Sequence, residues 1–253
     1  VPKDDPTLRE ATPETIGRLT RDDVVAYFRR VYRPDMTVIE IIGDIEPQAA
    51  REAVLSAFGG WTAEGPTPDV TPPTIPDPPA ANIQMDGEGR TQDRVFLMQT
   101  LALRQGTAET TTFDLGNAVL GRGFSSRLFQ ALRGSTGYVY TVGSTVSTDR
   151  TRGMFSITLG ADPAKVPRVK AEILSILDDM CHRPVGADEL GRVRAGYLRT
   201  MPFADASLDA IALRDVGLAT RGLPLDQPDR NIAAVQAATP ERVRDLFART
   251  LRP

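Results

Sequence analysis

A proline-rich segment separates the chain into two blocks of unequal length. Residues 62–80 (TAEGPTPDVTPPTIPDPPA) contain seven prolines. Proline fixes the backbone φ angle and lacks the N–H group that helices and sheets use, so such a segment is expected to be extended and semi-rigid. We therefore predict that residues 62–80 form a linker between a first block, residues 1–61, and a second block, residues 81–253.

The length and charge of the chain exclude several classes of protein. A chain of 253 residues, 41% hydrophobic and 25% charged, is long enough to bury a core. Its net charge of −3 gives no reason to expect a basic surface for nucleic acid. No apolar run approaches the roughly 18–20 residues that span a bilayer. We expect neither a nucleic-acid partner nor a membrane span.

The chain has one cysteine and one histidine, and they are adjacent. Cys181 alone cannot form an intramolecular disulfide. His182 alone cannot supply the histidine pair of an H-E-x-x-H or H-x-x-E-H zinc site. His182 lies in DDMCHRPVG at the expected end of a helix, where we expect a surface cation beside the last carbonyl groups rather than a member of a catalytic triad. We predict no metal site and no cofactor in this chain.

The first block is expected to contain helices and one strand. Thr12 before Pro13, and Thr20 before two acidic residues, are typical helix N-caps. The β-branched run 36–44 (MTVIEIIGD) predicts a strand. Residues 46–61, with proline near the start and Gly-Gly near the end, predict another helix.

The second block combines strands with a helical run. Strands are expected at 82–87, 93–103, 138–148 and 153–161, and helices at 107–121, 125–134, 163–180, 187–201, 207–222 and 238–251. Strands followed by helices indicate an α+β fold, with helices packed on one face of a mostly antiparallel sheet.

Two distant segments share a pattern. Residues 20–34 (TRDDVVAYFRRVYRP) match residues 239–253 (TPERVRDLFARTLRP) at six of fifteen positions, with an offset of 219 residues. If this repeat is real, the chain contains the end of one domain followed by most of a second, truncated domain. The 36–58 block could then complete the sheet of the second block, within one chain or by exchange in a homodimer.

The segment 120–144 (LGRGFSSRLFQALRGSTGYVYTVGS) resembles the M16 (pitrilysin-like, inverzincin) zinc metallopeptidases. In that family the corresponding segment reads roughly L-G-x-G-x-x-S-R-L-x-x-x-L-R-x-x-x-G-x-x-Y-S. Residues 27–61 similarly resemble the family's domain end, roughly Y-x-P-x-N-x-x-L-x-x-x-G-D. The resemblance implies a LuxS/MPP-like α+β domain of the non-catalytic kind, since this chain has no histidine pair. It also implies zinc in a partner domain or subunit and a peptide substrate.

The resemblance assigns roles to four residues. Arg133 and Tyr140 match an arginine and a tyrosine that the zinc-free domain contributes to the partner's active site. Tyrosine would support the transition state as a hydrogen-bond donor, and arginine would position the substrate. Phe124 and Ser125 are expected to contact the substrate. We also expect Tyr138 to share one side of its strand with Tyr140, because side chains alternate along a strand.

Simpler interpretations remain open for the same residues. Arg133 could be a helix C-terminal cation, and Tyr140 an ordinary half-buried sheet residue. Ser125 or Ser126 could cap the following helix. A phosphate loop is disfavoured because no G-K-[ST] follows the glycines. The carboxylate pairs, Asp22 with Asp23 and Asp178 with Asp179, are expected to be helix surface charges.

Three functions are compatible with the sequence. The first is the non-catalytic half of an M16-type peptidase, inactive alone. The second is a structural or assembly protein of the same family with no peptidase role. The third, a different stand-alone enzyme, is disfavoured because the serines and threonines have no activating base. The compartment is not indicated, and a secreted or periplasmic parent is compatible with the sequence.

Overall fold

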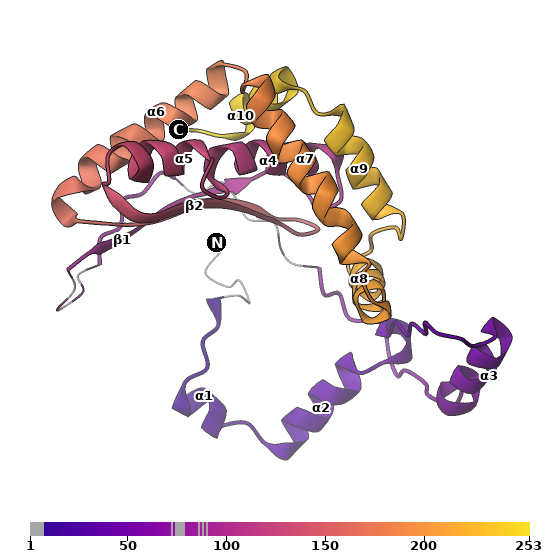
Figure 1. Cartoon of the computed structure of the whole chain (residues 1–253). Helices are drawn as coiled ribbons and strands as arrows, with labels where there is room; N and C mark the ends of the chain where they lie inside the picture. The colour runs from indigo at the N-terminus through magenta and orange to yellow at the C-terminus, as the bar shows by residue number, and fades with distance from the viewer. Residues whose placement is uncertain (1–7, 72, 74–78, 86, 88, 90) are drawn as a thin grey trace. The chain divides into compact units, whose positions relative to one another are not determined.

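The structure of the chain is a computed structural model that describes residues 8–71, 73, 79–85, 87, 89 and 91–253 (Figure 1). The chain forms two compact units. Unit 1 comprises residues 1–73 and 202–225, and unit 2 comprises residues 74–201 and 226–253. Part of the linker predicted at 62–80 lies outside the described residues, and its described residues are in neither helix nor strand. The predicted domain boundaries therefore stay a prediction.

Unit 1 contains short helices, and α1, α2 and α3 bury no side chain. Its helices are α1 (Pro13–Gly17), α2 (Arg21–Val31), the 3-10 turn η2 (Pro34–Met36), α3 (Pro47–Phe58) and α8 (Leu208–Thr220). Thr12 and Thr20 cap α1 and α2 through reciprocal capping boxes, as predicted. No residue of α1, α2 or α3 is buried.

The strand predicted at 36–44 does not form. Residues 37–42 are in neither helix nor strand and pair with no strand among the described residues. Val38, Ile39 and Ile41 remain exposed. A β-branched sequence favours extended backbone, but a strand also needs a neighbouring strand to accept its hydrogen bonds. The prediction was wrong because this second requirement is not met within unit 1.

The buried side chain of Arg33 joins the end of α2 to the start of the proline-rich segment. Arg33 forms a two-pronged ion pair with Asp35, at 2.9 and 2.8 Å. Its other donors bind the carbonyl oxygens of Glu64 and Gly65, at 2.7 and 3.0 Å. Hydrogen bonds from Arg33 and Thr67 hold the pKa of Asp35 well below its usual value. This contact fixes the start of the proline-rich segment against the end of α2.

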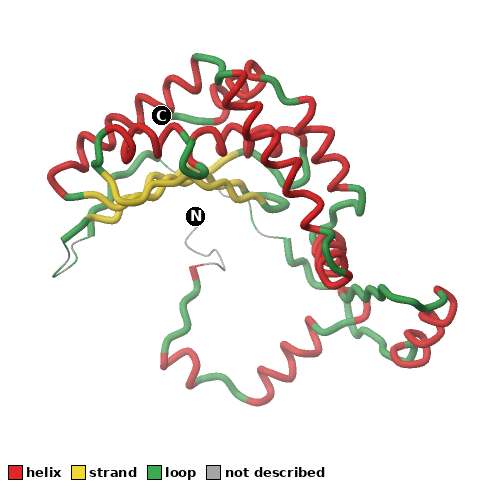
Figure 2. The backbone as a smooth tube through the Cα atoms, viewed as in Figure 1, coloured by secondary structure: helices red, strands yellow, loops and turns green. Residues whose placement is uncertain are grey.

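Unit 2 is an α+β domain, as predicted. Its sheet has the antiparallel order β1–β3–β2, with β1 at Asp93–Leu101, β2 at Val139–Thr148 and β3 at Gly153–Ala161. The helices are α4 (Ala108–Gly121), α5 (Arg127–Phe129), the π-helical turn η3 (Gln130–Ser135), the 3-10 turn η4 (Pro163–Lys165), α6 (Val166–His182), α7 (Ala187–Ala204, which runs into unit 1), α9 (Gln227–Ala237) and α10 (Pro240–Thr250). Helices α4, α5, α6 and α10 cover one face of the sheet (Figures 1 and 2).

The core of unit 2 lies between the sheet and these helices. Alternate residues of β3 are buried, and Ile157 and Leu159 point into this layer. Phe113 of α4 stacks on Phe247 of α10 at 4.6 Å and meets Phe155 of β3 edge-on at 6.0 Å. The last helix, α10, therefore packs into the same core as α4 and β3.

Three further predictions need correction. Residues 82–85 and 87 form no strand. Helix α9 was not predicted, because its residues 227–237 show no clear apolar period. The helix expected at 125–134 is one turn of α-helix that widens into the π-helical turn. Within the described residues, no helix is both long and apolar enough to cross a membrane.

Candidate functional site

The site predicted from the sequence begins in a tight loop after α4. Gly123 has a φ of +81°, a conformation that side chains other than glycine rarely adopt. Phe124 and Ser125 follow it and are exposed. Ser126 is buried, and its hydroxyl donates to the Gly123 carbonyl at 2.7 Å. Ser126 is thus the N-cap residue of α5, but its side chain tightens the loop instead of accepting a helix N–H.

The segment that carries Arg133 is a widened helical turn. The hydroxyls of Ser135 and Thr136 each bind a carbonyl five residues earlier, at 3.0 and 3.1 Å. Gly137, with a φ of +62°, then reverses the chain into β2. Gln130 ties the turn to the loop by donating to the Phe124 carbonyl at 2.6 Å. Single π-helical turns of this kind are frequent at functional sites.

Tyr140 lies at a β-bulge. Val139 is opposite Ala161 and Thr141 is opposite Gly160, so Tyr140 is an extra residue in β2. The bulge breaks the alternation of the strand. Tyr138 precedes β2 and packs partly against the core, whereas Tyr140 is 69% exposed, so the two rings have different surroundings. That they share one side of the strand stays a prediction.

Arg133 and Tyr140 lie in contact. The Arg133 guanidinium donates to the Tyr140 backbone carbonyl. It also lies over two rings, 4.8 Å from the centre of Tyr140 and 5.6 Å from that of Phe129. Phe124 in turn meets Phe129 edge-on at 5.1 Å. We call Phe124, Phe129, Arg133 and Tyr140 the arginine–aromatic cluster.

The cluster leaves two aromatic rings and a cation accessible to solvent. Phe124 is 79% exposed, which is costly for a phenylalanine that only fills space. A cation over an exposed ring contributes about 0.5–1 kcal/mol, too little to explain the arrangement by itself. The cluster presents a planar cation and apolar ring faces together, a combination suited to peptide carbonyl groups and apolar side chains.

Phe129 was missed in the sequence. It lies four residues before Arg133, the spacing at which two helical side chains meet on one face. That spacing was the available signal. Ser125, by contrast, is exposed in the loop and is not part of the cluster.

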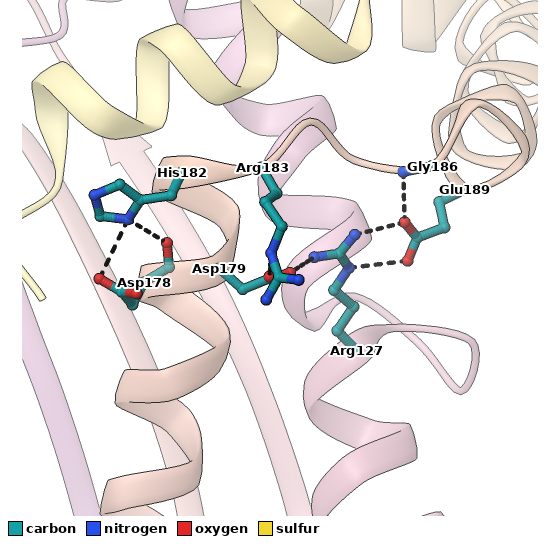
Figure 3. A network of polar contacts seen from close by, with 7 residues as sticks. All are labelled: Arg127, Asp178, Asp179, His182, Arg183, Gly186 and Glu189. Atoms are coloured by element: carbon teal, nitrogen blue, oxygen red, sulfur yellow. Dashed lines mark hydrogen bonds and ion pairs between the residues drawn. The ribbon is translucent and has the colours of Figure 1, made fainter.

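A second arginine, Arg127 at the start of α5, pairs with carboxylates of two other helices (Figure 3). Arg127 binds both oxygens of Glu189, at 2.9 and 2.7 Å, and one oxygen of Asp179 at 2.9 Å. Arg183 also pairs with Asp179, and the Gly186 N–H donates to Glu189 at 2.8 Å. We call this set the Arg127 network. It links α5, α6 and α7.

The Arg127 network corrects one interpretation. Asp179, expected to be a plain surface charge, is half-buried and shared by two arginines. Hydrogen bonds from Arg127 hold the pKa of Glu189 below its usual value, against the opposing effect of burial. Charged partners of this kind fix the helices relative to one another because leaving either carboxylate unpaired is costly.

The only histidine does not make a metal site. The His182 ring nitrogen lies 2.8 Å from the Asp178 carbonyl and 3.2 Å from its carboxylate, at the exposed end of α6 (Figure 3). This is the helix-terminal position predicted for it. Within the described part of the chain, no group of three His, Cys, Asp or Glu side chains could hold a metal ion. The residues present do not fit a catalytic zinc.

Two relatives match part of the chain in sequence. An uncharacterised zinc protease of Streptomyces coelicolor is 27% identical over 190 residues, and one of Bacillus subtilis is 25% identical over 179. These matches cover 72% and 71% of this chain but only 40% and 42% of the relatives, so the chain spans less than half of their length.

Solved structures share the fold. The peptidase M16 inactive domain from Pseudomonas fluorescens superposes with a TM-score of 0.80 at 21% identity, covering 95% of this chain and 56% of that one. A protease from Helicobacter pylori gives 0.80 at 16% identity, covering 96% and 58%.

A family model described as the peptidase M16 inactive domain matches residues 18–197. The match runs through the arginine–aromatic cluster and most of the sheet and helices of unit 2. The chain belongs to the M16 peptidase family, as an inactive domain of zinc protease-like proteins.

Proposed function

We propose that this chain is the zinc-free half of an M16-type peptidase. In this proposal it binds peptide substrate and contributes Arg133 and Tyr140 to an active site whose zinc is held by another domain or subunit. The observation that carries the proposal is the contact between these two side chains. Arg133 stacks on Tyr140 at an exposed bulge, beside a π-helical turn that the Arg127 network anchors.

The two side chains would act differently. Tyr140 is exposed, so its hydroxyl can donate to the oxygen on which negative charge develops during peptide hydrolysis. Arg133 offers a planar guanidinium that can hold a substrate carbonyl or carboxylate. Part of that guanidinium is already used by the Tyr140 carbonyl, which fixes its plane. Arg133 is therefore assigned to positioning and Tyr140 to charge stabilisation.

The alternative, an assembly protein without peptidase role, needs no such cluster. A structural subunit would gain little from an exposed phenylalanine beside an arginine stacked on tyrosine. Retention of the cluster therefore favours peptide binding.

The test uses this chain assembled with its zinc-bearing partner domain or subunit. Tyr140→Phe removes only the hydroxyl and should lower kcat by roughly 10²–10³-fold, the usual cost of one such donor. Arg133→Ala should mainly raise KM. Tyr138→Phe is the matched control, because that ring packs on the core under Arg168. An unchanged kcat for Tyr140→Phe would refute the assigned role, and an assembled complex that cleaves no peptide would favour the assembly alternative.

A further inference from the structure

The sheet of unit 2 has a second face, which its helices do not cover (Figure 2). On this face Phe96 and Met98 of β1 are 55% and 60% exposed. The hydroxyls of Thr145 and Ser156 lie 2.8 Å apart across β2 and β3, and Ser156 alternates with side chains of β3 that are buried in the core. We call the alternate residues of 94–100, 141–147 and 154–160, which share this side, the open face.

The open face has a positive charge and no negative one. Arg94 is its single charged residue, and none of its members is an aspartate or a glutamate. The Arg94 side chain is exposed and makes no hydrogen bond or ion pair with the described residues. All the donors of its planar guanidinium are therefore available to a ligand, unlike those of Arg127 and Arg133.

The open face is flat between Arg94 and the arginine–aromatic cluster. Arg94 is opposite Gly160 of β3, and the same Gly160 is opposite Thr141, the residue after Tyr140. A Cβ at Gly160 would meet only the Gln92 side chain, at 3.6 Å. Neighbouring strands are about 4.8 Å apart, so the backbones of Arg94 and Thr141 are about 10 Å apart. A peptide that contacts Tyr140 can therefore cross β3 and reach Arg94 without meeting a side chain at Gly160.

We infer that Arg94 determines substrate specificity by pairing with an acidic side chain about three residues from the cleaved bond. The inference rests on the proposed function, which places the cleaved bond at Tyr140. An extended peptide advances about 3.3 Å per residue, so about three residues span the distance from Tyr140 to Arg94. A guanidinium binds a carboxylate through two parallel hydrogen bonds, and no carboxylate of the open face competes for it. The occupant of the open face is thus a peptide with an aspartate or a glutamate at that distance.

Matched peptides test the inference in the chain assembled with its zinc-bearing partner domain or subunit. The peptides differ only at one position, which is aspartate, asparagine or lysine and is moved along both sides of the cleaved bond. The parent complex should prefer aspartate to asparagine at a position about three residues from that bond. We expect a difference of about three- to fivefold in kcat/KM, the usual effect of one solvent-accessible ion pair.

Substitutions of Arg94 assign the preference to this residue. Arg94→Ala should abolish the difference between aspartate and asparagine and leave kcat for the asparagine peptide unchanged. Arg94→Glu should reverse the preference, so that the lysine peptide is cleaved faster than the aspartate peptide. Arg104→Glu is the matched control, because Arg104 is exposed beyond the end of β1 and its side chain makes no ion pair with the described residues. It changes the charge of the chain equally and should leave the preference intact.

Several outcomes would overturn the inference. Equal effects of Arg94→Glu and Arg104→Glu would show that only the net charge matters, and an aspartate preference that persists in Arg94→Ala would place the carboxylate elsewhere. Failure of Arg94→Glu to assemble, seen in light scattering, would assign the open face to the partner interface. Tyr140→Phe separates the two proposals. If it lowers kcat while the Arg94 variants keep the parent's selectivity, only the role of Arg94 is refuted, whereas an unchanged kcat refutes the proposed function itself.

Discussion

Arg127 of α5 and Arg133 of the π-helical turn that follows it lie six residues apart and have opposite environments. Arg127 is half-buried and paired with two carboxylates, whereas Arg133 is exposed and lies over two rings. The first arginine can contribute to stability because its partners are partly shielded from water. The second contributes little to stability and remains accessible to a ligand. In this segment Arg127 is therefore paired within the fold, whereas Arg133 is exposed to solvent.

The anchoring role of Arg127 can be measured. Arg127→Met keeps much of the apolar stem but leaves Glu189 and Asp179 without their shared partner. We expect the free energy of unfolding to fall by about 2–3 kcal/mol, as for half-buried charged hydrogen bonds. Urea denaturation would give the value. Arg183→Ala is the control, because Arg183 pairs with the same Asp179 from an exposed position and should cost less than about 1 kcal/mol. Equal losses in the two variants would contradict an anchoring role.

The Arg127 network also predicts acid sensitivity. The pKa of Glu189 in the folded chain is below its ordinary value of 4.5, so the stabilisation from its ion pair is fully present above that pH. It is lost as pH falls through the lower folded pKa, because protonation removes the pairing with Arg127. Denaturation across a pH series should show stability decreasing below about 4.5, and Glu189→Gln should flatten that decrease. An unchanged pH profile in Glu189→Gln would show that other carboxylates control it.

At the scale of elements, the close approach of α4 and α10 depends on one glycine. A Cβ at Gly116 would lie 2.5 Å from Phe247 and 2.7 Å from Val243. Phe247 cannot move aside easily because it is fully buried and stacked on Phe113. The short distance at which α4 and α10 cross is therefore possible because Gly116 has no side chain.

Gly116→Ala should destabilise the chain although alanine favours helix. The overlap with α10 is expected to cost about 1–3 kcal/mol, more than the gain of about 1 kcal/mol in helix propensity. Gly196→Ala in α7 is the control, because no atom lies within 4 Å of the added Cβ. It should stabilise by about 0.4–1 kcal/mol. Stabilisation by both variants in thermal unfolding would show that α10 does not pack this closely.

Local signals found most elements of the fold. Threonine caps predicted at Thr12 and Thr20 were followed by helices, and apolar alternation predicted β2 and β3. The failures share one cause. Residues 37–42 form no strand, and Tyr140 is an extra residue in β2, because strand formation and register both depend on the neighbouring strand.

At the scale of the whole molecule, the missing metal site leads to a further prediction. Equilibrium dialysis of the isolated chain should show no stoichiometric zinc binding, and the chain should not cleave peptides, because it has one histidine and no metal-binding cluster among the described residues. His182→Ala is the control and should leave any weak surface binding elsewhere unchanged. Tight binding of one zinc ion per chain would contradict the assignment to a zinc-free half.

The sequence by itself determined the family, the α+β class, the exclusion of a histidine-pair zinc site and the candidates Arg133 and Tyr140. These depend on residue identity and local spacing, which a single chain displays directly. Only the tertiary structure added Phe129 to the cluster, placed Tyr140 on a bulge and joined Arg127 to Glu189. Those features depend on contacts between residues that are distant in the sequence, such as Arg127 and Glu189, which are 62 positions apart. Local patterns do not encode such pairings.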